Sequence, residues 1–506
     1  MKNMERLRRF CICAALGMAL ALVGMLALGG IGMTAVLRAP ETVRYAMGGA
    51  AGHLLGMTLM ILAALGLARL FARFARIHLT AITTMVWGLL AAAFLLGCAT
   101  RQEVDFAYVC EAAERFAQGA YGPLTSDYFS AYSYQLGTCL MLEVVLRLLP
   151  GVDIEVLMQG LNVLMSVAAA GMLAALGQMI FEDVRVRYGT MALYLLSLPM
   201  ALYSMHVYGT LPMLMFSAAA MLCFALYIRT KRRRYGLLYA LCAALAYMVK
   251  PNAAIVVLAL LICAALYAME SRDVRLLGFA VLSAVGAVLL ARLAVTQYEW
   301  RSGTVLREDV SMLARLVMGL QDGSRAAGWY NGYTEQFFPA AVSAAQERAT
   351  AYADLAARLQ EMADSPAGTL RFFAQKAVSQ WLEPTYGTLL YGNYCQQLGP
   401  LAEAAQAVFS EQSALRLALE GVMKAWQQAL YLLSALGLFQ CLRMKRRTVL
   451  LILPVTVLGG FLYHMIFEAK SQYIFVYAMY LIPLAALGLA VLSDGLSRAV
   501  RRFRKS

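Results

Sequence analysis

The chain has 506 residues, of which 61% are hydrophobic and only 14% are charged, and its formal net charge is +14. Apolar runs of about 18 or more residues recur along it, each long enough to cross a hydrocarbon core roughly 30 Å thick. This composition excludes a soluble globular domain and predicts an all-α polytopic membrane protein. Lys and Arg cluster in the short connections between apolar runs, which indicates membrane topology rather than nucleic-acid binding.

The first apolar run follows the basic start MKNMERLRRF, whose charges hold the N-terminus in the cytoplasm. The run is too long for a cleaved signal peptide and further spans follow it, so we expect a retained signal anchor. Successive basic turns then alternate with polar loops, giving twelve crossings with both termini cytoplasmic. These spans are predicted at about 11–37, 46–70, 79–98, 155–180, 190–208, 210–228, 236–250, 253–269, 276–296, 428–442, 448–467 and 473–493.

A shorter apolar piece, 136–149, lies between the first outer loop and the run 155–180. Only an odd number of crossings can join an outer loop to the basic inner turn at Arg185, so one of the two pieces does not cross. The shorter piece carries Glu143 and Arg147, which can pair at i and i+4 on a helix. We therefore expect 136–149 to be an interfacial helix on the outer surface.

The polar segment between the ninth and tenth spans is external by the same alternation, and its composition predicts helices with amphipathic stretches. Ten cysteines contain no CxxC pair, and Cys110 and Cys395 would both face outside, where pairing stays open. The chain thus divides into N-terminal spans (1–98), a first external loop with interfacial helices (99–150), central spans (151–297), an external helical segment (298–425), and C-terminal spans with a basic tail (426–506).

The first external loop begins with a carboxylate, Asp105. The stretch EVDFAYVCEAAERFAQG predicts a helix on which Asp105 shares a face with Val109 and Phe116, while Glu111 and Arg115 pair on another. We expect Asp105 to lie on the apolar side of this helix, turned towards the membrane or the protein. The simpler interpretation is a carboxylate that interacts favourably with the helix dipole.

A second polar cluster lies at the outer end of the eleventh span, in YHMIFEAKSQYIF. His464 and Glu468 are i, i+4 neighbours that could share a metal ion, and Lys470 could offset a phosphate charge. The alternative is an ordinary loop whose lysine reaches the membrane interface. Lys250, before a proline at another outer turn, has the same two interpretations.

Several common catalytic motifs are absent from the sequence, namely GxxxxGK[ST], HExxH and GxSxG. Nucleotide-dependent and zinc-protease chemistry therefore lack support. A cytoplasmic nucleotide-sugar donor would also have no soluble domain to bind it.

Taken together, these segments resemble the GT-C superfamily of polyprenyl-phosphate-sugar glycosyltransferases, and most closely the Gram-positive bacterial membrane proteins related to protein O-mannosyltransferases. The likeness covers most of the chain in order and spacing. Ser133 stands where that group has Pro, and Gln472 where it often has Arg. The resemblance to this family lies in the segments VDFAYVCEAAERFAQGAYG, YFSAYSYQLG, KPNAAIVVLALLI, MGLQDGSRAAGWYNGY, KAVSQWLEPTYG and FEAKSQYIFVYAMYLIPLAALGL.

The resemblance implies a GT-C-like bundle and an inverting transfer of a sugar from a polyprenyl phosphate to an acceptor hydroxyl. Asp105 would be the general base, and the leaving phosphate would need Lys, Arg or a divalent metal such as Mg²⁺ or Mn²⁺. The resemblance implies that the donor phosphate is bound by Lys470, Lys250, Gln472 and Tyr473. The acceptor or sugar would be bound by Tyr128, Tyr132, Gln135, Trp329 and Asn331. A metal would be bound by His464 and Glu468.

Two other functions stay open. A transporter or flippase of lipid-linked glycans would need charged residues within its spans, and few are present. A sensor or assembly scaffold would use the external segment as a binding module. For a glycosyltransferase we expect a bacterial plasma-membrane location with an external site. Its partners would be the lipid-linked donor, a cell-envelope glycan or protein acceptor and membrane lipids, with no nucleic acid.

Overall fold

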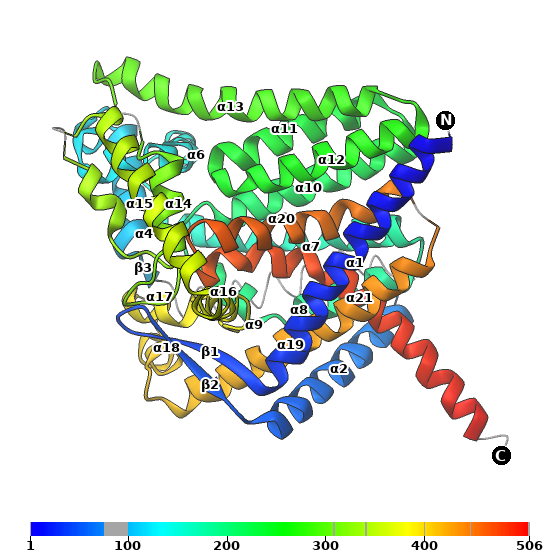
Figure 1. Ribbon diagram of the computed structural model, residues 1–506. Helices are drawn as coiled ribbons and strands as arrows, with labels where there is room; N and C mark the ends of the chain where they lie inside the picture. Colours follow the sequence, from blue (N-terminus) through cyan, green and yellow to red (C-terminus); the bar gives the residue numbers. More distant parts are fainter. Residues whose placement is uncertain are drawn as a thin grey trace.

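The computed structural model describes residues 2–74, 100–306, 309–339, 342–398, 400–445 and 447–503, which fold into a helical bundle (Figure 1). Among these residues, eight helices are long and apolar enough to cross a membrane, which confirms the predicted all-α polytopic class. They are α1 (Lys2–Gly32), α2 (Ala50–Arg73), α7 (Ile154–Phe181), α10 (Thr210–Thr230), α12 (Ala254–Ser271, after a 3₁₀ turn at Pro251–Ala253), α13 (Arg275–Ser302), α20 (Ile452–Ile466, after a 3₁₀ turn at Thr448–Leu451) and α21 (Ser471–Phe503).

The other predicted spans have different outcomes. The span 79–98 lies outside the described residues. The span 236–250 corresponds to α11 (Arg233–Val249), and the span 428–442 lies within the longer helix α19 (Ala414–Arg443).

The predicted span 190–208 is wrong as one continuous helix. Helix α8 (Val184–Leu195) ends inside this range, and a short helix α9 (Leu198–Tyr203) starts afresh with Pro199 in its first turn. Proline has no backbone N–H to donate to a preceding turn, but it is well tolerated where a helix begins. The residues that follow, up to Tyr208, leave the helix and turn towards the polar end of the bundle.

The centre of the bundle is α21, whose side chains from Ile474 to Leu489 are almost all buried. It crosses α19 at very close range, because both helices have glycine at the contact. A methyl group on Gly437 would come within 2.0 Å of the Leu484 carbonyl oxygen, and one on Gly488 within 1.9 Å of the Leu433 carbonyl oxygen. Small residues of this kind allow membrane helices to approach each other.

Basic turns gather at the end of the bundle that also holds both chain termini (Figure 1). Arg8 in α1 forms an ion pair with Glu270, at the end of α12, with a distance of 2.9 Å. Arg447 before α20 pairs with Glu182 after α7 at 2.7 Å. These contacts join turns that the sequence analysis assigns to one side of the membrane.

The opposite end of the bundle carries the polar loops (Figure 1). The predicted loop helices are present, with the expected Glu111–Arg115 and Glu143–Arg147 pairs at 2.6 and 2.8 Å. The helices here are α4 (Val104–Ala117), α5 (Asp127–Ala131), α6 (Leu136–Leu148), α14 (Met312–Leu320), α15 (Ala344–Asp364), α16 (Pro366–Trp381), α17 (Thr388–Tyr394) and α18 (Ala402–Phe409), with 3₁₀ turns at Gly122–Thr125, Ser133–Gln135 and Tyr333–Phe337.

Two small antiparallel pairs of strands also lie at this end. Strand β3 (Thr100–Arg101) pairs with β4 (Gln396–Gln397) and so ties the start of the first loop to the external segment. Strands β1 (Met33–Arg38) and β2 (Thr42–Met47) form a hairpin between α1 and α2. The first span, predicted at about 11–37, is therefore too long at its end, because α1 stops at Gly32 and the next residues form β1.

Contacts on both strands hold the hairpin against the external segment. The Ala35 N–H donates to the Leu382 carbonyl at 3.2 Å, and the Val43 N–H donates to the Arg325 carbonyl at 3.0 Å. Nearer the tip, the Arg38 guanidinium donates to the Glu420 carboxylate on α19 at 2.9 Å. The tip of the hairpin is therefore fixed over the polar end of the bundle.

Candidate active site

A cavity of about 530 Å³ lies at this polar end, between the hairpin tip, the start of α4, the segment before α6, α17 and the loop before α21. The segments come from distant parts of the chain, so tertiary packing alone creates the site. Eight of the residues selected from the sequence line it: Asp105, Tyr128, Tyr132, Gln135, Glu468, Lys470, Gln472 and Tyr473.

Asp105 lies in the first turn of α4 and faces the cavity. It forms no hydrogen bond or ion pair with any residue that the structure describes. Its side chain is exposed to the cavity, and the walls of that cavity are formed by protein. Val109 and Phe116, further along the same helix, are fully buried.

The surroundings of Asp105 alter its acidity. Enclosure by protein raises the pKa of the carboxyl above the ordinary aspartate value, because burial disfavours the charged form. The positive charge of Lys470 opposes this rise, and the negative charge of Glu41 adds to it. A carboxylate with a raised pKa is a stronger base than an ordinary aspartate.

The start of α4 is held by a buried amide, Gln102. Its Nε2 donates to the Met205 carbonyl at 3.0 Å, and its Oε1 accepts from the Val207 N–H at 2.9 Å. The next turn begins at Val104, whose φ of 49° is an unusual backbone conformation for a β-branched residue. The rigid support and the strained residue both lie directly before Asp105, as is common at functional sites.

Two cations in the cavity converge on one carboxylate, Glu41 at the hairpin tip. The Lys470 Nζ lies 2.6 Å from Glu41 Oε1, and Arg325 donates to Oε2. The Tyr391 hydroxyl also donates to Oε1, at 2.9 Å. Burial acts to raise the pKa of Glu41, but Lys470 and Arg325 outweigh it and hold that pKa below the ordinary glutamate value. Glu41 is therefore a buried anion, neutralised by two cations.

Tyrosine rings form the side of the cavity next to Asp105. Tyr108 and Tyr128 stack with their ring centroids 5.2 Å apart, and Tyr132 lies 5.3 Å from Tyr128. Gln135 follows on the same segment and donates to the Tyr208 hydroxyl. Tyrosine offers an apolar face and a polar tip, which suits a sugar ring with its mixed surface.

A buried lysine, Lys376, holds the backbone of the loop that carries Glu468 and Lys470. The Lys376 Nζ, on α16, donates to the Phe467 carbonyl at 2.7 Å and also to the Gly319 carbonyl. Glu468 itself accepts from the Tyr473 hydroxyl at 3.2 Å, and burial raises the pKa of its carboxyl. This loop therefore presents one acid and one cation to the cavity on a fixed backbone.

Of the twelve selected residues, four do not line the cavity: Lys250, Trp329, Asn331 and His464. Lys250 is buried, donates to the Thr210 hydroxyl at 2.7 Å and lies 4.5 Å from the centre of the Tyr208 ring. The Trp329 indole N–H donates to the Ser379 hydroxyl at 2.9 Å, in the protein interior. Asn331 donates to the Gln321 side chain at 3.0 Å. The structure therefore does not bring these residues to the cavity.

The pair selected for a metal, His464 and Glu468, does not fit that role. The Nδ1 atom of His464 contacts the Glu468 backbone carbonyl at 3.1 Å rather than its carboxylate. In the described part of the chain, no group of three or more His, Cys, Asp or Glu side chains could hold a metal ion. Cys110 and Cys395, which could have paired, are both free thiols.

The residues missed in the sequence are Glu41, Arg325, Tyr391 and Tyr394, all of which line the cavity. Arg325 lies within the segment MGLQDGSRAAGWYNGY, where only Trp329 and Asn331 were selected. For Glu41 the available signal is the presence of β-branched residues on both sides of Ala39-Pro40, which favours a strand–turn–strand unit.

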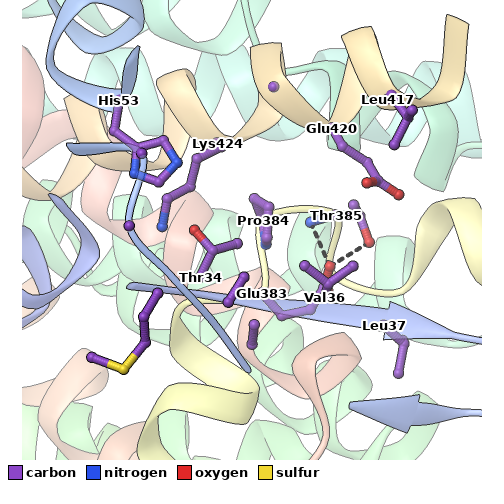
Figure 2. Close-up of a pocket in the computed structure, with 16 residues that line it drawn as sticks. Thr34, Val36, Leu37, His53, Glu383, Pro384, Thr385, Leu417, Glu420 and Lys424 are labelled. Carbon is purple, nitrogen blue, oxygen red and sulfur yellow. Dashed lines mark hydrogen bonds between the residues drawn. The ribbon is translucent and has the colours of Figure 1, made fainter. Parts of the chain in front are cut away.

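A second cavity, of about 410 Å³, lies between the body of the hairpin and α19 (Figure 2). Its charged groups already have partners. Glu420 accepts from Arg38, Glu383 accepts from the Thr385 N–H and hydroxyl, and the Lys424 Nζ donates to the Met33 carbonyl at 2.8 Å. Because its carboxylates are paired, it is a weaker candidate for proton transfer than the first cavity.

The fold and site define a multi-pass membrane protein with a cavity, at one end of its bundle, that holds an unpaired carboxylate near two cations. Residues 50–491 match the family of conserved hypothetical integral membrane proteins, and the chain belongs to this family. No curated protein matches the sequence.

Among solved structures, the chain is similar to the archaeal oligosaccharyltransferase AglB from Archaeoglobus fulgidus, determined in complex with an inhibitory peptide and a dolichol-phosphate. The sequence identity is 12% and the TM-score is 0.44, over 85% of this chain and 52% of that one. The chain therefore spans about half the length of this structural relative.

Proposed function

We propose that this protein is an inverting glycosyltransferase that moves a sugar from a polyprenyl phosphate to an acceptor hydroxyl. The observation that carries the proposal is the unpaired carboxylate of Asp105 in the same cavity as Lys470 and Arg325. A base for the acceptor and cations for a leaving phosphate are the two groups that this reaction needs.

In the proposed reaction, the acceptor hydroxyl transfers its proton to Asp105 as its oxygen attacks the anomeric carbon of the sugar. The bond between that carbon and the phosphate oxygen breaks, and its electron pair leaves with the phosphate. The donor phosphodiester carries one negative charge, and the product phosphomonoester carries up to two. Lys470 and Arg325 stabilise the charge that develops, in a site partly shielded from water.

The cavity's position in the bundle suits a lipid-linked donor. Both chain termini and the basic turns lie at the other end, and basic connections are normally cytoplasmic. The cavity end would then face outward, with the donor's tail in the bilayer and its headgroup in the cavity. We expect the helical segment 298–425, which supplies Arg325 and Tyr391, to admit the acceptor, either a cell-envelope glycan or a protein.

The test is a transfer assay with the purified full-length protein in vesicles, supplied with a labelled polyprenyl-phosphate sugar and candidate acceptors. We expect labelled sugar to appear on an acceptor in step with release of polyprenyl phosphate. Movement of intact donor across the vesicle, with the sugar–phosphate bond unbroken, would identify a transporter and reject the proposal.

A further inference from the structure

Both cations of the cavity, Lys470 and Arg325, are bound to a carboxylate of the protein itself, Glu41. Its side chain is only 8% exposed, and three donors converge on it: Lys470 at 2.6 Å, the Tyr391 hydroxyl at 2.9 Å, and Arg325. This carboxylate lies on the hairpin between α1 and α2, whereas all three donors come from residues 325–470. Two distant parts of the chain therefore meet through one charge cluster.

The donors around Glu41 are those that bind phosphate in proteins. Arginine presents a planar fork of N–H groups to phosphate oxygens, and lysine offers a compact positive charge. A carboxylate and a phosphodiester each carry one negative charge, so the same donors can recognise either. Since Glu41 is buried against Lys470 and Arg325, a phosphate can contact both cations only if the Glu41 carboxylate is displaced.

We propose that Glu41 is a built-in competitor of the donor phosphate: it occupies the phosphate subsite formed by Arg325, Lys470 and Tyr391, and donor binding displaces it. This inference rests on the proposed function, because it takes the phosphate to be that of the lipid-linked sugar. The exchange leaves the net charge of the cluster unchanged when the donor binds. After transfer the product phosphate has gained charge, and the return of Glu41 to the cations helps to expel it.

The backbone of the hairpin suits a movement confined to its tip. Both strands are tied to the external segment, at Ala35 and at Val43. At the tip, Glu41 has a φ of 75°, in the left-handed region that glutamate rarely adopts. Displacement of the carboxylate would allow residues 39–42 to relax while the strands stay in place.

A purely structural role for Glu41 makes the opposite prediction. If Glu41 only holds Lys470 and Arg325 in position, its removal should weaken phosphate binding. If Glu41 competes with phosphate, its removal should strengthen binding. The sign of the change therefore separates the two roles.

The experiment measures the binding of farnesyl phosphate and of inorganic phosphate to the purified full-length protein in lipid nanodiscs. We expect Glu41→Gln to bind farnesyl phosphate about tenfold more tightly than the wild type, since one charge-assisted contact no longer has to be broken. The matched control is Glu420→Gln, which removes an equal charge beside the same hairpin (Figure 2). Glu420 is bound by Arg38 and Arg416 instead. The affinity of this variant should stay within about twofold of the wild type, because Glu420 shares no partner with the phosphate subsite.

A second measurement needs no variant and covers the case in which Glu41→Gln does not fold. Hydrogen–deuterium exchange at residues 39–42 of the wild type should rise when farnesyl phosphate is added, because the Glu41 N–H leaves its 2.8 Å bond to the Arg38 carbonyl. Increased protection there, or weaker binding by Glu41→Gln, would overturn the proposal.

The two ligands and the transfer assay separate the remaining outcomes. If Glu41→Gln binds both farnesyl phosphate and inorganic phosphate more tightly than the wild type, the subsite recognises phosphate itself. If only the affinity for farnesyl phosphate increases, the lipid is also required. Either result supports competition. Equal affinity of the wild type and Glu41→Gln for farnesyl phosphate would overturn it. If sugar transfer is still observed in that case, the proposed function stands without this inference.

Discussion

Replacing Asp105 by Asn is expected to lower kcat for sugar transfer by about 100- to 10,000-fold, the usual contribution of a general base. The amide has nearly the same shape as the carboxylate but cannot accept the acceptor's proton at neutral pH. Asp105 has no partner among the described residues, so the change breaks no ion pair or hydrogen bond within them. The affinity for the donor should not fall, which can be measured separately with farnesyl phosphate.

The control for this prediction is Glu111→Gln, on the same helix. Glu111 pairs with Arg115 on an exposed face of α4, at 2.6 Å, and does not line the cavity. Its replacement should leave kcat within about twofold, as expected for an exposed ion pair of small energy. Unchanged transfer by Asp105→Asn would remove Asp105 from the role of base.

Removal of either cation of the phosphate subsite is the second large effect. We expect Lys470→Gln and Arg325→Gln each to lower kcat/KM by about 100- to 1,000-fold, as for the loss of one group that stabilises developing negative charge. Lys470 also lowers the pKa of Asp105, and a base must be ionised to act. In Lys470→Gln that pKa rises further, so the acidic limb of the pH–rate profile should move to higher pH.

The matched control for the cations is Arg371→Gln, which removes the same charge from an exposed position on α16. This variant should change neither kcat/KM nor the position of the acidic limb of the pH–rate profile. If Lys470→Gln loses activity but its acidic limb stays at the wild-type pH, Lys470 does not lower the pKa of Asp105. If kcat/KM is unchanged in both subsite variants, the leaving phosphate is stabilised elsewhere.

The parts of the site that follow local rules could be predicted from the sequence. Helix α4 and its Glu111–Arg115 pair follow from i, i+4 spacing, as does the pair of Glu143 and Arg147 on α6. The meeting of Asp105 with the loop around Lys470 does not follow from spacing. Only the resemblance to GT-C enzymes predicts it, because it depends on how distant helices pack.

The hairpin could not be separated from the first span by hydropathy. Residues from Met33 to Leu37 continue the apolar run of α1, so the run was assigned to one helix ending at 37. A strand here requires pairing with Thr42–Met47, and hydropathy carries no information about pairing. Glu41 was therefore assigned to an ordinary connection between spans.

In the segment around Trp329, the side chains that line the cavity are Arg325 and Tyr330, and the selected Trp329 and Asn331 do not line it. Gly328 and Gly332 have φ values of 69° and 81°, so the chain turns sharply on both sides of Trp329. These turns direct Trp329 to Ser379 in the interior, whereas Arg325 and Tyr330 line the cavity. The direction of a side chain between two such turns is set by tertiary contacts rather than by the sequence pattern.

The most direct test of the central claim is the anomeric configuration of the transferred sugar, determined by NMR on the product formed from a donor of defined configuration. A single displacement in which Asp105 acts as base predicts complete inversion at the anomeric carbon. Retention of configuration would require a covalent or otherwise two-step reaction, and would contradict the account.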